Sequence, residues 1–358
     1  MKILHVITTI DRGGAENQLL TLVRQQVKSG HKVEVIPLKG RLELFESFKT
    51  LGCEINTQLA NENFLFQIFH YLRHINKSVP NIIHAHLPQA ELICSIRKRN
   101  SKLIVTRHNA ENFAPRFPAI LSRICSRYIE IRANSVIAIS NAVKSYLIEK
   151  REIKDGDKIK VVYYGFDDSE VDNSEKMFTK KLDINFINLV AVGRLVPQKD
   201  FPTLFHALRA CKDINMKFKL TIYGEGLLKN YLVSLGKSLD LSHEILFHGR
   251  IMNVTKTLKK FDVLILSSKY EGFGLILLEG MQSGIPILAS NNSAIPEVLG
   301  PKHLGLFPTE NFKELSLLIQ QCYNYQFRSE IIKNQSKQIK KFNPAVMNLR
   351  MNEIYVNS

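Results

Sequence analysis

The sequence has no tryptophan, few cysteines and no long apolar run. The absence of tryptophan excludes nothing. The five cysteines are scattered, odd in number and never spaced as Cys-x-x-Cys, which argues against a disulfide scaffold or a zinc site and fits a reducing cytosol. No apolar segment approaches the ~18 residues that a membrane-spanning helix needs. Residues 1–10 have one charge before their apolar stretch and lack a small-residue cleavage site, so we expect a buried strand there rather than a signal peptide.

Acidic residues are scarce relative to basic ones. The chain carries 49 Lys and Arg against 33 Asp and Glu, a formal net charge of +16, which indicates an anionic partner. We do not expect nucleic acid, because no recognition motif is present. The excess is densest in 97–132, which is either a basic amphipathic helix suited to an anionic membrane face or a surface helix whose apolar stripe lies in the core. Its basic residues are Arg97, Lys98, Arg99, Lys102, Arg107, Arg116, Arg123, Arg127 and Arg132, and the apolar residues at helical spacing are Ile120, Leu121, Ile124, Tyr128 and Ile131.

The most informative stretch is 271–286. Glu271 and Glu279 lie eight residues apart and bracket a Gly-Phe-Gly loop and an apolar run. A hydrophobic strand is expected over 261–266 and a helix from about Leu275. This order puts Glu271 at the carboxyl end of a strand, where open α/β sheets bind ligands. It puts Glu279 on the first turns of a helix whose free N–H groups attract phosphate. The stretch could therefore hold a sugar, a diphosphate and a ribose, or it is a surface glycine turn before an ordinary amphipathic helix.

This stretch resembles the Glu-x7-Glu signature of the retaining glycosyltransferases of family 4. The resemblance implies an α/β chain with the GT-B fold: two facing Rossmann-like domains, an interdomain cleft and a C-terminal helix that crosses back. It also implies that Glu271 contacts the donor sugar and that Glu279 holds the ribose. Ser267 and Gly280 stand where the family often has Pro and Ala, and neither change removes a functional group. The segment between the two carboxylates would line the donor site through Gly272, Phe273, Gly274, Leu275 and Ile276.

Further segments of the second half match the same family. The segment 193–200 resembles its Gly-Arg-Leu-x-x-x-Lys motif, which implies that Arg194 and Lys199 neutralise the two phosphates of the leaving group. The turn at Gly224 is a variant of the family's Gly-Asp/Glu-Gly-Pro turn. The segment that ends at Ile251 resembles the one whose backbone reads the edge of the nucleobase.

The match is thinner in the first half. The Gly13-Gly14 turn resembles the Gly-Gly-Ala-Glu loop that lines the cleft near the donor phosphate and the acceptor. His108 stands at the Thr-x-His position, which implies an approach to the 6-position of the donor sugar, and His86 is a second histidine that could face the same cleft. Tyr164 replaces Asn in the segment that closes the first domain.

A chain of 358 residues is long enough for two domains of about 150–200 residues each. Strand and helix patterns open the chain and restart near 186, so we expect Rossmann-like domains at 1–165, on the acceptor side, and 183–342, on the donor side. The polar stretch around 165–183 is the expected hinge. Residues 343–358 are expected to form the helix that returns to the first domain.

The resemblance implies a retaining hexosyltransferase for cell-surface polysaccharide, including lipopolysaccharide. It would move a sugar from a nucleoside diphosphate, uridine being favoured over guanosine, to a hydroxyl of a glycan or lipid-linked glycan. We expect no metal and no cofactor, because no Asp-x-Asp stands where a metal-dependent transferase needs one and because Arg194, Lys199 and the amides at Leu275-Ile276 could stabilise the leaving diphosphate. The expected location is the cytoplasm, with peripheral contact to the inner face of the plasma membrane as a hypothesis.

Three other classes stay open at this point. A nucleotide-sugar 2-epimerase would have the same two-domain build and need no acceptor. A glycan phosphorylase would need a lysine that carries pyridoxal phosphate. A non-catalytic anion-binding module would not need to keep all five of the residues Glu271, Glu279, Arg194, Lys199 and His108.

Overall fold

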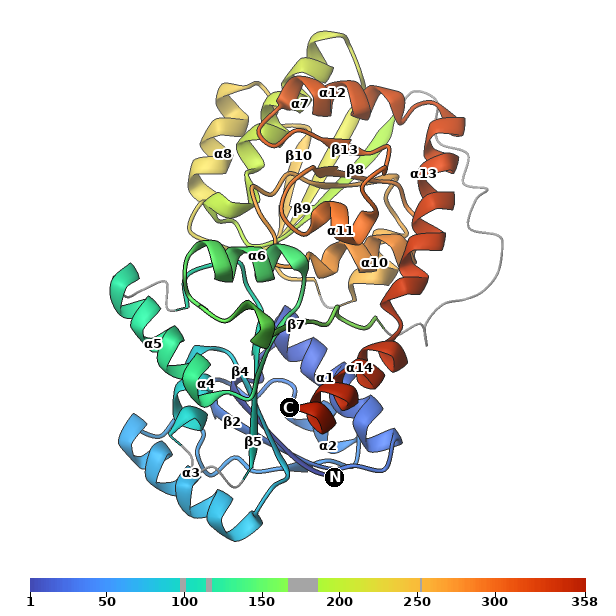
Figure 1. Ribbon diagram of the computed structural model, residues 1–358. Coiled ribbons are helices and arrows are strands. Elements are labelled where there is room, and N and C mark those ends of the chain that lie inside the picture. The colour runs from blue at the N-terminus through green and yellow to red at the C-terminus, as the bar shows by residue number, and fades with distance from the viewer. Residues whose placement is uncertain (97–100, 114–117, 167–185, 252) are drawn as a thin grey trace. The chain divides into compact units, whose positions relative to one another are not determined.

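The computed structural model describes residues 1–96, 101–113, 118–166, 186–251 and 253–358 (Figure 1). The chain divides into unit 1, Met1–Asp167 with Phe342–Ser358, and unit 2, Asp168–Lys341. Each unit is built on one parallel sheet. Apart from Gly165 and Phe166, the expected hinge at 165–183 lies outside the described residues, as do Arg97, Lys98, Arg99 and Arg116 of the basic stretch.

Unit 1 contains a seven-stranded sheet in the order β3-β2-β1-β4-β5-β6-β7. Every strand pair is parallel. Helices cover both faces, so the central strands are almost entirely buried and their sequences are mainly apolar, interrupted by histidines in β1 and β4. The strands are β1 Lys2–Thr9, β2 Lys32–Lys39, β3 Glu54–Ile55, β4 Ile82–His86, β5 Lys102–Arg107, β6 Ser135–Ala138 and β7 Ile159–Val161. The helices are α1 Gly14–Lys28, α2 Phe45–Lys49, α3 Phe64–Ser78, α4 Pro88–Ser95, α5 Ala119–Arg132, α6 Asn141–Glu149 and α14 Pro344–Asn357.

Unit 2 contains a six-stranded parallel sheet in the order β10-β9-β8-β11-β12-β13. The strands are β8 Ile187–Val192, β9 Phe218–Tyr223, β10 Ile245–His248, β11 Val263–Leu266, β12 Ile287–Ser290 and β13 Leu306–Phe307. The helices are α7 Phe201–Asp213, α8 Lys229–Ser238, α9 Val254–Leu258, α10 Leu275–Ser283, α11 Ile295–Leu299, α12 Phe312–Gln321 and α13 Tyr325–Gln338. The expected strand at 261–266 begins two residues late, because the Phe261 amide closes a turn on the Leu258 carbonyl.

Both sheets reverse their winding direction once. In unit 1 the chain moves from β1 to β2 on one side and returns to β4 on the other. In unit 2 the same reversal separates β8 from β11. Open α/β sheets bind ligands at the carboxyl ends of the strands that flank such a point. The predicted α/β class with two Rossmann-like sheets is confirmed, and the topology marks one candidate edge in each unit.

The last helix, α14, belongs to unit 1. Pro344 occupies its first turn, where the missing N–H costs nothing, and the Asn343 side chain accepts the Ala345 amide. Met347, Met351 and Tyr355 are buried against strand and α1 residues of unit 1. A Cβ on Gly165 would lie 2.6 Å from the Pro344 Cα, so only glycine allows this close approach.

The apolar stripe of α5 faces outward. Ile120, Ile124 and Ile131 are 72, 59 and 69% exposed, whereas Ser122, Ser126 and Glu130 are buried. The alternative in which this stripe packs in the core is therefore wrong. Glu130 is buried because its carboxylate accepts the amides of Lys154 and Asp155, at 2.8 and 2.7 Å. Among the described residues, no helix is long and apolar enough to cross a membrane.

The core of unit 1 contains three fully buried histidines, His5, His84 and His86. Burial lowers the pKa of His5 to about 4 and lowers the pKa of His84 and His86 well below the ordinary value of 6.5. An imidazole without solvent disfavours the added charge, so these rings are neutral in the folded chain.

These rings predict acid lability. Below pH 6.5 the unfolded histidines bind protons that the folded rings bind only at much lower pH, so the contribution of each ring to the unfolding free energy falls by up to about 1.4 kcal/mol per pH unit. Thermal unfolding of the full chain at pH 7.5, 6.5 and 5.5 measures this. His243→Asn, at an exposed position, should keep the slope, whereas His5→Gln should reduce it. The raised pKa values of Glu91 and Glu279 act in the opposite direction over the same range, so the comparison between variants is the test. Equal pH slopes for His5→Gln and His243→Asn would contradict the prediction.

Candidate functional site

The predicted phosphate-binding residues follow β8. Gly193 follows the strand directly, and the 3-10 turn Pro197–Lys199 leads into α7. Asp200, between that turn and α7, has φ +45° and its carboxylate accepts the Thr203 hydroxyl at 2.7 Å. Arg194 is exposed and donates to the Gln198 side chain at 3.3 Å. The turn therefore brings Arg194 and Lys199 to the carboxyl edge of the sheet.

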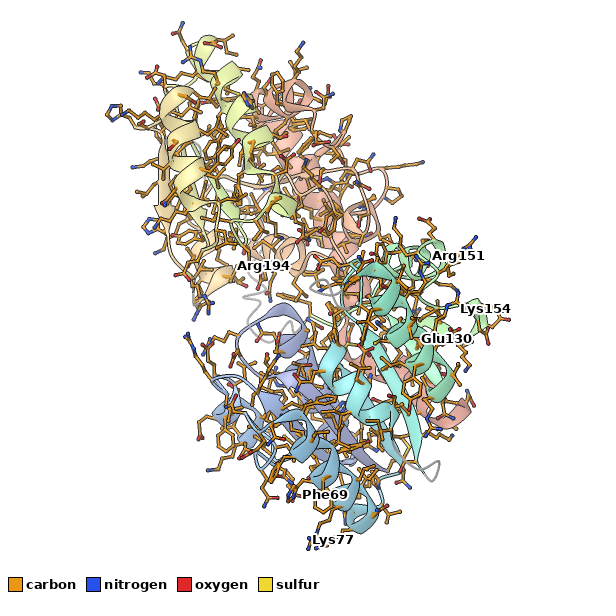
Figure 2. All side chains as sticks on the ribbon, turned by 90° about the vertical axis from the view of Figure 1, so that its left-hand side faces the viewer. Phe69, Lys77, Glu130, Arg151, Lys154 and Arg194 are labelled. Carbon is orange, nitrogen blue, oxygen red and sulfur yellow. The ribbon has the colours of Figure 1, made fainter. Side chains whose placement is uncertain are left out.

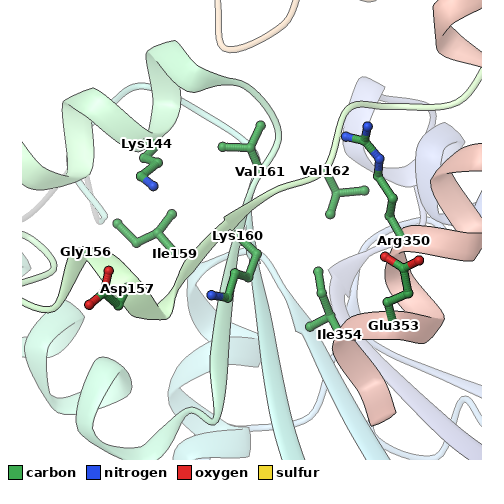
Figure 3. Close-up of a pocket in the computed structure, with 10 residues that line it drawn as sticks. All are labelled: Lys144, Gly156, Asp157, Ile159, Lys160, Val161, Val162, Arg350, Glu353 and Ile354. Atoms are coloured by element: carbon green, nitrogen blue, oxygen red, sulfur yellow. The ribbon is translucent and has the colours of Figure 1, made fainter. Parts of the chain in front are cut away.

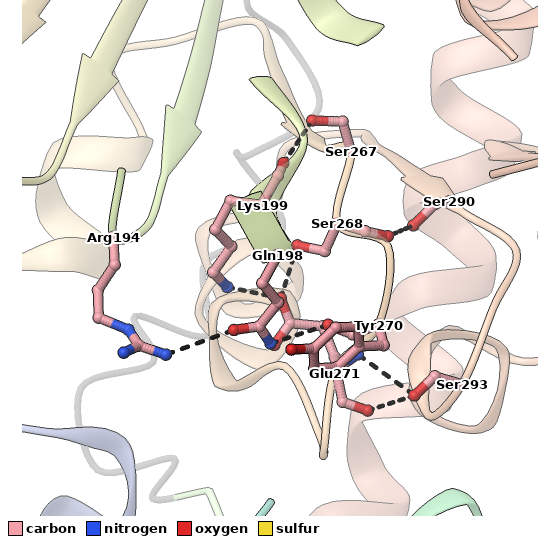
Figure 4. A network of polar contacts seen from close by, with 9 residues as sticks. All are labelled: Arg194, Gln198, Lys199, Ser267, Ser268, Tyr270, Glu271, Ser290 and Ser293. Atoms are coloured by element: carbon pink, nitrogen blue, oxygen red, sulfur yellow. Dashed lines mark hydrogen bonds and ion pairs between the residues drawn. The ribbon is translucent and has the colours of Figure 1, made fainter. Parts of the chain in front are cut away.

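Lys199 meets Glu271 at that edge (Figure 4). The Lys199 Nζ lies 2.5 Å from the Glu271 Oε1, and the exposed fractions of the two side chains are 13 and 9%. The Ser268 hydroxyl donates to the same Oε1 at 2.6 Å. Among the described residues, the Glu271 Oε2 accepts no hydrogen bond, so this oxygen can accept one from a ligand.

A ring of side chains fixes the Glu271 loop (Figure 4). The Glu271 amide donates to the Ser293 hydroxyl at 3.2 Å, and that hydroxyl donates to the Glu271 carbonyl at 2.6 Å. Gln198 donates to the Tyr270 carbonyl at 2.9 Å, and Ser290 donates to the Ser268 carbonyl. Sequence reasoning missed Gln198, Ser268, Ser290 and Ser293, because isolated serines and glutamines near glycine loops carry no distinctive pattern.

Helix α10 begins at Leu275, where the sequence predicts it. Gly274 precedes it with φ +84°, a conformation that favours glycine, and no side chain caps the helix. The first N–H groups, at Leu275 and Ile276, are the orphan donors of a helix start and can bind an anion. Gly272 and Phe273 form the loop between Glu271 and this helix, and Phe273 is buried.

Glu279 lies on the second turn of α10 and is partly buried. Burial raises the pKa of its carboxyl group to about 7. Within the part of the chain that the structure describes, its carboxylate has no hydrogen-bond or ion-pair partner. A partly buried carboxylate without a partner is costly, and a ligand that donates hydroxyl groups would offset that cost.

The predicted nucleobase segment lies at the ends of β9 and β10. A Cβ on Gly224 would lie 1.9 Å from the Gly193 carbonyl oxygen, so a side chain there would push the two loops apart. The Gly224 amide donates to the His248 carbonyl at 3.2 Å. Ile251 follows β10 and is partly buried, two residues beyond Gly249.

Unit 1 presents its own group of predicted residues at the reversal between β1 and β4. Gly13 is the N-cap of α1, and a Cβ there would lie 2.4 Å from the Glu16 carboxylate. Gly14 opens α1. His108 follows β5, and burial lowers its pKa to about 3. Its Nε2 lies 3.2 Å from the His86 Nδ1 and its Nδ1 lies 2.6 Å from the Tyr164 hydroxyl, so both ring nitrogens are already engaged.

Two other features of unit 1 were considered as sites. His5, His84 and His86 are close enough to hold a metal ion, but each of their ring nitrogens has a hydrogen-bond partner. A hollow of about 470 Å³ lies beside β7 and α14, lined by Lys160 and Arg350 among others (Figure 3). None of the predicted site residues lines it.

The ion pair between Lys199 and Glu271 predicts that removing its cation lowers the free energy of unfolding. Lys199→Met leaves the Glu271 carboxylate with Ser268 alone, and breaking a buried ion pair on one side typically costs about 3–5 kcal/mol. Urea unfolding should show a drop in unfolding free energy of that order. Lys269→Met is the matched control, because Lys269 pairs with Glu310 at the surface, where the two side chains are 43 and 59% exposed, and its loss should change stability little. Equal effects of the two substitutions would show that the Lys199 pair is not buried in solution.

Two families match the chain, one in each half. Residues 12–170 match Glycosyltransferase Family 4, and residues 172–340 match Glycosyl transferases group 1. Together they span the edges at which both groups of predicted residues lie.

Related proteins match over nearly the whole chain. A Campylobacter jejuni protein, named as an α-1,4-N-acetyl-D-galactosaminyltransferase that acts on a diphospho-undecaprenol-linked glycan, is 27% identical over 96% of this chain and 94% of its own. An uncharacterised Klebsiella pneumoniae protein from a cps region is 24% identical over 89% of this chain and 88% of its own.

Solved structures share the fold. Anabaena HepE, crystallised with UDP, superposes with a TM-score of 0.82 at 19% identity, over 100% of both chains. A glycosyltransferase from Rickettsia africae superposes with a TM-score of 0.80 at 21% identity, over 99% of both chains. The fold, the edge residues and the two family matches agree, and this chain belongs to the family 4 glycosyltransferases with the GT-B fold.

Proposed function

We propose that this glycosyltransferase is a retaining, metal-independent hexosyltransferase. It moves a sugar from a UDP-sugar to a hydroxyl of a glycan or lipid-linked glycan in cell-surface polysaccharide biosynthesis, including that of lipopolysaccharide. The observation that carries the proposal is the Lys199–Glu271 pair beside the uncapped start of α10, at the carboxyl edge of the unit 2 sheet. The Campylobacter relative is named for a lipid-linked acceptor, and HepE was crystallised with UDP and with UDP-glucose, which supports both substrate classes.

The residues of unit 2 divide the work of holding the donor. Arg194, Lys199 and the amides at Leu275 and Ile276 stabilise the charge that builds on the leaving diphosphate, and preorganised donors of this kind typically contribute about 3 kcal/mol each to lowering the barrier. This positive charge takes the place of a metal ion, and no cofactor is needed. The edge formed by Gly224 and Ile251 receives the nucleobase.

Glu271 orients the donor sugar. Its Oε1 is held by Lys199 and Ser268, and its Oε2 accepts a sugar hydroxyl. A carboxylate fixed in this way positions the sugar and does not act as a covalent nucleophile. The acceptor hydroxyl attacks from the side of the leaving group, and the departing phosphate oxygen takes its proton.

Unit 1 binds the acceptor. Gly13 and Gly14 bring bare backbone to the carboxyl edge at the start of α1, and His108 lies at the same edge. A hollow of about 420 Å³ beside α5 is lined by Arg123, Lys150 and Glu152, and the excess of positive charge there suits the phosphates of a lipid-linked acceptor.

Glu279 holds the ribose and gives the donor site a pH signature. Its carboxyl pKa of about 7 leaves it neutral in the free chain at pH 6 and ionised at pH 8. Ribose hydroxyls donate more strongly to the ionised form, so the affinity for a nucleotide sugar should rise by about tenfold from pH 6 to pH 8. The diphosphate of a nucleotide sugar does not titrate in this range. Calorimetric titration measures the change.

This titration tests the whole proposal when it is combined with a thermal-shift panel and a transfer assay. A thermal-shift panel of nucleotide sugars first identifies the donor, which at ~100 times its dissociation constant should stabilise the chain by about 2.7 kcal/mol. Glu279→Gln should abolish the pH dependence, whereas the exposed Glu330→Gln should leave it intact. Transfer to an acceptor should persist in EDTA. No stabilisation by any nucleotide sugar would refute the proposed function, and epimerisation of the donor without acceptor would replace it.

We further propose that the protein is cytoplasmic and touches the inner face of the plasma membrane through α5. Its exposed isoleucines lie beside Arg123 and Arg127 on a chain of net charge +16. Helix α3 lies on the same side of unit 1 (Figure 1), and it exposes Leu65 and Phe69, at 77 and 63%. Figure 2 turns this side toward the viewer, with Phe69 and Lys77 labelled. Exposed apolar groups next to cations suit an anionic bilayer surface.

Sedimentation with liposomes tests this contact. The wild-type chain should pellet with anionic vesicles at low salt and much less with neutral ones, because each basic residue near an anionic surface contributes about 1 kcal/mol. Arg123→Glu with Arg127→Glu should release it. The matched control, Lys229→Glu with Lys313→Glu, makes the same change of charge on exposed residues of unit 2 and should still pellet. Equal release by the two double substitutions would show that the attraction depends on the net charge of the protein and not on α5.

A further inference from the structure

A chain of hydrogen bonds runs inward from His108. The Tyr164 hydroxyl lies 2.6 Å from the His108 Nδ1, and the His108 Nε2 lies 3.2 Å from the His86 Nδ1. The His86 Nε2 lies 3.1 Å from the His5 Nδ1, and the His5 Nε2 lies 2.8 Å from the Gln26 Oε1. These side chains come from β1, β4, α1 and the residues that follow β5 and β7.

The chain of hydrogen bonds continues to α14, the last helix of the protein. The Gln26 Nε2 donates to the Tyr355 hydroxyl at 3.1 Å. That hydroxyl lies 2.7 Å from the His84 Nδ1, and the His84 Nε2 lies 2.6 Å from the Thr106 hydroxyl. Gln26 and His84 are fully buried, and Tyr355 is 1% exposed. The network therefore connects α14 to the edge of the sheet at which His108 lies.

The amide of Gln26 sets the direction of this chain. Its nitrogen donates to Tyr355, so its oxygen must accept from the His5 Nε2. A neutral imidazole has a single N–H, so His5 accepts at Nδ1 from the His86 Nε2. By the same reasoning His86 accepts from the His108 Nε2, and His108 accepts at Nδ1 from Tyr164. The tautomer of each ring therefore determines the tautomer of the next ring in the hydrogen-bond chain.

Neutral rings are what the surroundings favour. Burial lowers the pKa of all four histidines, so none carries the second proton that would break this single direction. Every ring nitrogen in the chain of hydrogen bonds has a partner, and these bonds account for the close packing of His5, His84 and His86.

We propose that Gln26, His5 and His86 are positioning residues for His108, which they hold in the Nε2–H tautomer with its Nδ1 accepting from Tyr164. In this state the ring has no free N–H, so His108 meets a ligand through its carbon edge and backbone. A ring fixed in this way keeps one position at the edge of the sheet, and misplacing a group at a reacting centre by about 1 Å can cost up to 100-fold in rate. The effect on catalysis rests on the proposed function, whereas the tautomer does not.

Nuclear magnetic resonance of the full chain with ¹⁵N-labelled histidine tests the proposal without any substrate. At pH 7.5 the wild-type His108 should show a protonated Nε2 and an unprotonated Nδ1. Gln26→Leu, three hydrogen bonds away, removes the acceptor of His5 and should move both His108 nitrogen resonances toward a mixture of tautomers. Gln18→Leu is the matched control. It makes the same change at a buried position of the same helix that is not part of the hydrogen-bond chain, and it should leave the His108 resonances unchanged.

Kinetics with the donor gives a second readout. Gln26→Leu should lower kcat by about tenfold or more with little change in the KM for the nucleotide sugar, because the proposed contacts to its diphosphate, ribose and nucleobase through Arg194, Lys199, Glu279 and Ile251 lie in unit 2. If Gln26→Leu does not fold, Tyr355→Phe cuts the chain one link further away and should mix the His108 tautomers in the same way.

Two results would overturn the proposal. One is a wild-type His108 protonated at Nδ1, which reverses the direction of the chain. The other is a folded Gln26→Leu variant whose His108 resonances do not move, which leaves the network a purely structural role. If the wild-type chain turns over no nucleotide sugar, the proposed function fails and the spectra still decide whether the chain of hydrogen bonds exists.

Discussion

The ion pair between Lys199 and Glu271 joins the loop after β8 to the loop after β11, across the point where the unit 2 sheet reverses direction. Two opposite charges that are both nearly buried stabilise each other only when the remaining hydrogen bonds are made as well. Ser268 supplies one of these, and Ser293 holds the backbone of the loop. Among the residues that the structure describes, the Glu271 Oε2 accepts no hydrogen bond, so it can accept one from a ligand at the edge where α/β sheets bind ligands.

The histidines of unit 1 are buried without charge. The core admits several of them because every ring stays neutral and has both nitrogens engaged, so none of these rings buries a charge. The polar groups form one chain from Tyr355 to Tyr164 instead of separate pairs. A neutral chain of this kind transmits orientation, since each ring donates once and accepts once, whereas a buried ion pair fixes only its two partners.

The exposed surface of unit 1 also depends on where its buried polar groups find hydrogen-bond partners. Helix α5 buries Ser122, Ser126 and Glu130 together with Ile129, and it exposes Ile120, Ile124 and Ile131, so most of its apolar residues face the opposite way from those of a usual surface helix. Glu130 has to face inward because it accepts two backbone amides of the following loop. The apolar stripe is then left outside, and exposed apolar groups of this kind indicate a partner surface.

The sequence by itself determined the α/β class, the positions of most strands and the start of α10, because apolar runs, glycine turns and Gly274 are local signals. Its motifs also selected Arg194, Lys199, Glu271 and Glu279. Only the tertiary structure decided which of these residues touch: Lys199 and Glu271 are 72 positions apart, and their meeting depends on the strand order. It also decided that both nitrogens of His108 are engaged and that the α5 stripe faces outward. Periodicity shows that a helix has two faces, but which face is buried depends on long-range hydrogen bonds that no local pattern records.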